Sequence, residues 1–68
     1  MKSEEEREWF EGESKISFAD AAKIAVENAE EEFRRRGEEY PTEYEVRFRV
    51  IAEGVLSDYK ALISPGGG

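Results

Sequence analysis

The 68-residue chain contains no cysteine and no histidine. It therefore cannot form a disulfide, offers no thiolate or imidazole to a metal ion, and lacks the Cys–His and Ser–His pairs of nucleophilic enzymes. We infer that it is not an enzyme. No apolar run reaches the roughly 18 residues that span a bilayer, and residues 1–8 are too acidic for a signal peptide. We expect a soluble, cytoplasmic protein that does not bind membranes.

Positive charge is also scarce, with 10 Lys and Arg residues against 17 Asp and Glu residues and a net charge of −7. Such a chain repels phosphate groups, which argues against a nucleic-acid partner. Glutamates cluster at 4–6, 30–32 and 38–39, but their spacing matches no calcium-binding loop. We interpret these clusters as solvated surface and expect no metal site in a single chain.

The small size of the chain predicts self-association. A domain of about 60 residues buries only about 60% of the surface that its unfolded chain exposes, and natural chains this short add disulfides, a metal or partner subunits. Disulfides are excluded here, so partner subunits are the leading remedy. We divide the chain into a flexible acidic lead-in over 1–8, one domain over 9–64 and a flexible Pro/Gly tail over 65–68.

The clearest local pattern predicts a helix over 18–36. Ser17 and Asp20 have capping-box spacing, three arginines occupy the last turn, and Gly37 provides a left-handed cap. A core-facing stripe at helical spacing comprises Phe18, Ala22, Ala25, Val26, Ala29 and Phe33. Its alanines predict close approach to another backbone, as when a helix lies on a sheet.

Three strands are expected around this helix. Residues 9–15 form the first, and alternation of apolar and polar residues predicts a long strand from Glu43 and a shorter one over 58–63, paired as an antiparallel hairpin. The fold class is α+β, in the order β-α-β-β, with a three-stranded antiparallel sheet packed on one helix. The sheet face away from the helix carries Glu45, Arg47, Arg49, Ile51, Asp58, Lys60 and Leu62.

Candidate contacts between subunits follow from this arrangement. The mixed-charge sheet face either lies in water or fits a symmetry mate, and we favour the mate, with Arg47 and Arg49 among the contacts. Ile24 points away from the helical stripe, as a surface isoleucine or a subunit contact. Trp9 in the first strand is core or interface filler, or a ligand platform. Tyr44 alternates onto the core side.

One short pattern resembles a known family. Residues Gly12, Ser14, Ser17, Phe18 and Ala21, followed by Ala25 and Ala29, resemble the signature of the dodecins. Glu45-Val46 early in the second strand and Tyr59 in the third also match the layout of that family. The similarity covers about residues 9–64. It implies one helix partly wrapped by a three-stranded sheet, with twelve copies closing into a hollow homo-oligomeric shell.

The resemblance also implies a ligand site. Dodecins usually store or sequester flavins at subunit interfaces, where a tryptophan just before the Glu-Val pair stacks on the ring and a glutamine in the last strand binds it. Glu43 and Lys60 stand at those positions here, and a carboxylate cannot stack on an aromatic ring. With Glu45, they are the candidate cofactor-pocket residues; Glu43 and Lys60 are also candidates for an ion pair between subunits.

Two functions are therefore expected. The first is a non-catalytic, dodecin-like shell subunit that binds or stores a small molecule or ions. The alternative is storage and sequestration of riboflavin or FMN in the usual dodecin manner, with a flavin as the cofactor.

Overall fold

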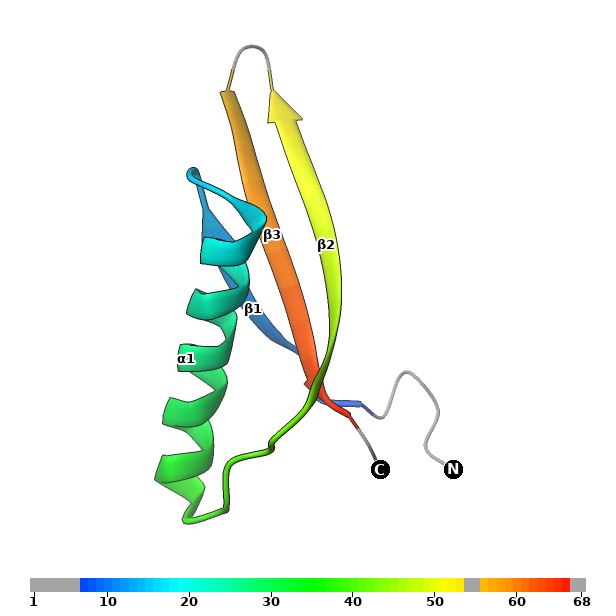
Figure 1. Ribbon diagram of the computed structural model, residues 1–68. Helices are drawn as coiled ribbons and strands as arrows, with labels where there is room; N and C mark the ends of the chain where they lie inside the picture. Colours follow the sequence, from blue (N-terminus) through cyan, green and yellow to red (C-terminus); the bar gives the residue numbers. More distant parts are fainter. Residues whose placement is uncertain (1–6, 54–55, 67–68) are drawn as a thin grey trace.

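The computed structural model describes residues 7–53 and 56–66. Its elements follow the order β1 (Phe10–Ser14), α1 (Phe18–Arg36), β2 (Tyr44–Glu53) and β3 (Leu56–Pro65). The strands form one antiparallel sheet in the order β1-β3-β2, and the single helix lies on one face of it (Figure 1). The predicted α+β class, element order and hairpin are confirmed. The glutamates at 4–6, which we interpreted as solvated surface, and residues 67–68 of the predicted tail lie outside the described residues.

The helix begins and ends where the sequence predicts. The Asp20 backbone N–H donates to the Ser17 hydroxyl at 3.0 Å. Gly37 adopts a left-handed conformation, with φ of 72°, and its N–H donates to the Arg34 carbonyl. The Asp20 carboxylate accepts a hydrogen bond from the Ser14 hydroxyl at 2.7 Å, which ties the helix start to the end of β1.

The helix and β1 approach each other very closely at Gly12. A Cβ atom added to Gly12 would lie 2.2 Å from the Ala21 carbonyl oxygen and 2.3 Å from the Ala25 nitrogen. The predicted close approach of the alanine-rich helix is therefore present. Ala21 is fully buried in this contact, although the predicted stripe omitted it, while Ala22 is only half-buried.

The third strand is longer than the alternation predicted, whereas the first is shorter, at Phe10–Ser14 against the expected 9–15. The third strand was expected over 58–63, but β3 extends from Leu56 to Pro65, while β2, expected from Glu43, runs from Tyr44 to Glu53. Pro65, which we assigned to the tail, pairs with Tyr44, and the Gly66 N–H donates to the Glu43 carbonyl at 3.0 Å. Proline is tolerated there because β1 pairs with β3 only as far as Ile63, so that β3 is locally an edge strand at Pro65.

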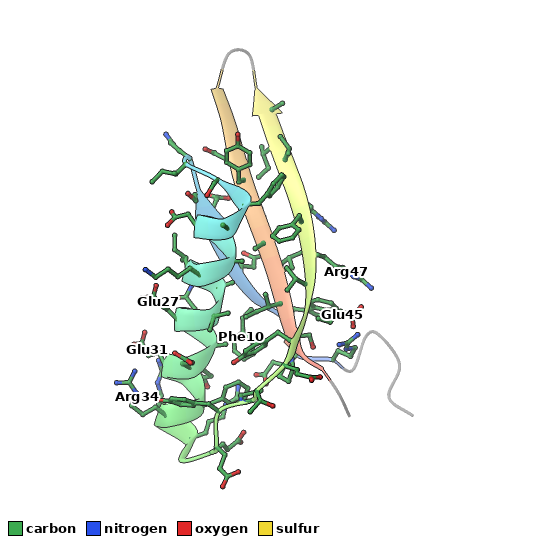
Figure 2. The ribbon with its side chains drawn as sticks, in the orientation of Figure 1. Phe10, Glu27, Glu31, Arg34, Glu45 and Arg47 are labelled. Atoms are coloured by element: carbon green, nitrogen blue, oxygen red, sulfur yellow. The ribbon has the colours of Figure 1, made fainter. Side chains whose placement is uncertain are left out.

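The buried core is small and rich in alanine. Its buried apolar side chains are Ala21, Ala25, Ala29, Phe33, Ala61 and Ile63. Around it, Phe10, which lies between helix and sheet in Figure 2, packs on Phe33 with ring centroids 5.5 Å apart. Four of the six core residues are alanines, so the core of the chain removes little apolar surface from water.

Candidate assembly and binding surfaces

The helix covers only part of the sheet face on which it lies. Cross-strand neighbours on that face form three rows, each with one residue from β1, β3 and β2 in turn: Phe10, Ile63 and Val46; Gly12, Ala61 and Phe48; Ser14, Tyr59 and Val50. The β1 and β3 members are buried or half-buried. The β2 members are exposed, at 39%, 50% and 53% for Val46, Phe48 and Val50.

We call Val46, Phe48 and Val50 the apolar column. It is exposed because α1 packs against β1 and β3, while β2 lies on the side of the sheet farthest from the helix (Figure 1). The first turn of α1 reaches it, where the Phe18 ring packs at a tilt against Phe48 with centroids 5.0 Å apart. The sequence predicted one apolar face for β2, and the structure shows that a single helix is too narrow to cover it.

The opposite sheet face is polar, as predicted, and Figure 2 shows Glu45 and Arg47 on it, pointing away from the helix. Two guanidinium groups flank Trp9 at this face: Arg7 lies 5.0 Å and Arg47 4.8 Å from the indole centroid. Arg7 also forms an ion pair with Glu45. Trp9 is half-buried and held by cation–π contacts, which do not distinguish a subunit contact from a ligand platform.

The three candidate pocket residues occupy separate places. Glu43 is exposed just before β2, and Glu45 is at its beginning, opposite Ser64. Lys60 lies in the middle of β3, four residues from Ser64 and hence roughly 13 Å along the strand. The Lys60 ammonium pairs with the Glu11 carboxylate of β1 at 3.3 Å. One copy therefore does not bring these residues into one pocket.

The remaining predicted contact residues lie on two different surfaces. Arg49 is exposed on the polar sheet face, opposite Lys60. Ile24 is half-buried on α1, one turn before Asn28, whose side-chain amide donates to the Glu11 carbonyl at 2.9 Å. Since residues four apart share a helix face, Ile24 lies on the flank of α1 that faces the β1 edge.

The segment before β1 makes contacts that the sequence analysis missed. Glu8 pairs with Arg36 in the last turn of α1, and Arg7 pairs with Glu45 on β2, so this segment connects the helix end to the far strand. Arg36 also pairs with Glu32, and these carboxylates raise the pKa of its guanidinium, with the Glu8 hydrogen bond as the largest cause. The sequence signal for these contacts was Arg7, a basic residue two positions before the aromatic Trp9.

Tyr44 contains an unusual buried group. Its hydroxyl is inaccessible to solvent and has no hydrogen-bond partner among residues 7–53 and 56–66. Burial, with a smaller effect from the negative charge of Glu30, raises the pKa of Tyr44 above its ordinary value. The predicted placement of Tyr44 beside the core is confirmed, and its unpaired hydroxyl is a cost of that placement.

Neither a metal cluster nor a membrane span is found in the part of the chain that the structure describes. No group of three or more Asp, Glu, His or Cys side chains there is placed to hold a metal ion. No helix within the same residues is long and apolar enough to cross a bilayer. Comparison with protein-family models, curated proteins and solved structures finds no match.

Proposed function

We propose that the chain is a non-catalytic subunit of a dodecin-like, homo-oligomeric shell that binds or stores a small molecule or ions. The observation that supports this most directly is the apolar column. Three adjacent β2 side chains, two of them at least half exposed, form a continuous apolar strip along an edge strand. Contiguous exposed apolar surface next to an open strand edge is typical of a protein interface.

The composition of the core supports the same proposal. Because four of the six buried apolar residues are alanines, the free energy of folding gains little from burial within one copy. Covering Phe48 and its two neighbours with another copy removes larger side chains from water. Association thus provides the burial that the helix alone does not supply.

Charge favours a cationic cargo over an anionic one. Each copy carries a net charge of −7, and closing many copies into a shell multiplies the negative potential that attracts cations. The alternative of flavin storage would need an aromatic surface and an amide where Glu43 and Lys60 stand, and Lys60 is engaged by Glu11. The dodecin resemblance is the reason to test it directly.

We further propose a cytoplasmic location for the shell. Small secreted domains usually depend on disulfides, and this chain contains no cysteine with which to form one.

The test of assembly is native mass spectrometry together with sedimentation at micromolar concentration. We expect a stable, large homo-oligomer, with twelve subunits as the stoichiometry of a dodecin-like shell. Val50→Glu should lower the native mass, because it places a carboxylate in the apolar column. Tyr40→Glu is the matched control, since Tyr40 is similarly exposed at 45% but lies in the α1–β2 connection. A folded, monomeric wild-type protein would contradict the proposal.

Ligand content is tested on the same sample. Colourless protein that does not quench added riboflavin or FMN fluorescence excludes flavin storage. Yellow protein, or quenching at stoichiometric concentration, would replace the ion or small-molecule assignment with the flavin alternative. Elemental analysis of the assembled protein before and after dialysis against chelator measures retained cations, and an empty shell would contradict ion storage.

A further inference from the structure

The position of the helix leaves the two edges of the sheet unlike each other. At the β2 edge the apolar column is exposed. At the β1 edge α1 overhangs the strand, since Asn28 donates to the Glu11 carbonyl and Gly12 lies against the helix backbone. The flank of α1 at this edge carries Ile24, which is only half-buried. One edge therefore has an uncovered apolar strip, and the other has a helix flank that projects beyond the sheet.

Charges on the polar sheet face differ between the same two edges and lie in register. Glu11 on β1 and Arg47 on β2 are both opposite Leu62, and Glu13 and Arg49 are both opposite Lys60. The β1 edge thus presents two carboxylates at the heights at which the β2 edge presents two guanidinium groups. Such a pattern is self-complementary under a sideways displacement of one copy by the width of the sheet.

We propose that copies associate head to tail, with the β1 edge and α1 flank of one copy placed against β2 of the next. This inference rests on the proposed assembly and specifies its contact. Ile24 of one copy covers the apolar column of its neighbour, while Glu13 of that copy lies beside Arg49 of the neighbour. The second copy is the occupant that both the charges and the apolar surface fit.

Symmetric edge contacts are disfavoured by the same charges. Two antiparallel β2 strands centred on Phe48 would place Arg47 opposite Arg49, and two β1 strands centred on Gly12 would place Glu11 opposite Glu13. Like charges directly opposite each other destabilise strand pairs, whereas opposite charges stabilise them. Charge complementarity selects the orientation of partners more than it adds affinity, so the apolar column supplies the burial.

The contact involves side chains more than a continuous backbone ladder. Asn28 already occupies the Glu11 carbonyl at the β1 edge, which blunts that edge against strand addition. Glu11 pairs with Lys60, and Arg47 lies over Trp9. Glu13 and Arg49 have no ion pair with any other described residue, so this pair is the better probe. A head-to-tail contact of this kind closes into a ring when the rotation between copies permits it.

The absence of cysteine allows a direct test by cross-linking. Ile24→Cys and Val50→Cys are introduced into separate chains, and the two variants are co-expressed. The assembled protein is then treated with a short-spacer bismaleimide. Ile24 lies on the β1 side of α1, whereas Phe18 on the same helix faces the apolar column, so the helix separates Ile24 from the column of its own copy. We therefore expect the co-expressed pair to give a covalent heterodimer. The double variant should give a ladder of multimers, and each single variant should remain uncross-linked.

Controls separate this contact from other arrangements. Glu27→Cys replaces Ile24→Cys as the matched control, because Glu27 is exposed on α1 and points away from the sheet (Figure 2). Cross-linking through Glu27→Cys as efficient as through Ile24→Cys would overturn the inference. So would dimers from Val50→Cys alone, which indicate a symmetric β2 contact, or a large native mass without any heterodimer.

A charge exchange tests the polar side of the contact independently. Glu13→Arg and Arg49→Glu should each raise the subunit concentration at half-dissociation about 3- to 10-fold, because each replaces an attractive pair by a repulsive one. The variant with both changes should regain the wild-type value. If the double variant dissociates at the same raised subunit concentration as the single variants, the inference is overturned. A monomeric wild-type protein would instead remove the proposed assembly itself.

Discussion

Gly12 and Phe48 lie in the same cross-strand row, on either side of Ala61, but Gly12 is buried beneath the helix and Phe48 is half exposed. The row shows where the helix rests. Gly12 and Ala61 let α1 approach closely, whereas the large side chains on β2 stay exposed, although Phe18 contacts Phe48. The same packing that completes the core leaves the apolar column exposed.

The first prediction concerns the close approach at Gly12. Gly12→Ala should destabilise the fold by about 3 kcal/mol, the upper end for overpacking, because the added methyl group meets helix backbone and not a movable side chain. Gly37→Ala is the control: its Cβ would meet nothing within 4 Å, so only the left-handed conformation adds a cost of about 1 kcal/mol. Denaturant unfolding measures both, and equal losses would contradict the packing described here.

Tyr44 should make the protein sensitive to alkaline pH. Burial raises its pKa in the folded state above the ordinary value of about 10, so its contribution to stability is full below that pH and is lost as the pH rises through the folded-state pKa. Tyr44→Phe should flatten this part of the pH profile. Because the hydroxyl has no partner among the described residues, the variant should also be neutral or stabilising by up to about 1 kcal/mol at pH 7.

Tyr40→Phe provides the comparison for Tyr44→Phe, since Tyr40 is exposed. It should leave the alkaline limb of thermal denaturation curves unchanged. Clear destabilisation by Tyr44→Phe at pH 7 would show that the hydroxyl has a partner in the assembled protein.

The contacts of Trp9 predict a spectroscopic change. Trp9 is the only tryptophan, so its fluorescence reports on this surface alone. Arg7→Ala should increase quenching by acrylamide, because the guanidinium that covers one part of the indole is removed, and should cost about 0.5–1 kcal/mol of stability. Arg34→Ala changes a side chain that points away from the sheet (Figure 2) and should leave quenching unchanged. Similar quenching in both variants would argue against the cation–π contact.

The hydrogen bonds at the start of α1 should behave as one unit. Ser17→Ala removes the N-cap acceptor and should cost about 1 kcal/mol. Ser14→Ala removes the partner of the Asp20 carboxylate and the acceptor of the Ile16 N–H, at a similar or larger cost. Since both serines bind Asp20, the double variant should lose less than the sum of the two. Strict additivity in a double-mutant cycle would contradict this coupling.

Local sequence determined the helix, its two caps and the alternation of the hairpin. Ser17 and Gly37 fix the helix ends through bonds to neighbouring residues, and these bonds need no tertiary partner. The predicted third strand was shorter than the observed one because Leu56, Ser64 and Pro65 interrupt or end the period-two pattern. Pairing with β2 extends β3 over them, and pairing is a property of two segments together.

The tertiary structure alone decided which apolar surface is covered. The sequence places Val46, Phe48 and Val50 on one face but does not give the lateral position of the helix above the sheet, which depends on the contact of Gly12 with Ala21 and Ala25. It also does not give the strand order β1-β3-β2, which separates the carboxylates of β1 from the guanidinium groups of β2. Periodicity assigns a residue to a face, whereas burial depends on how far the neighbouring layer extends.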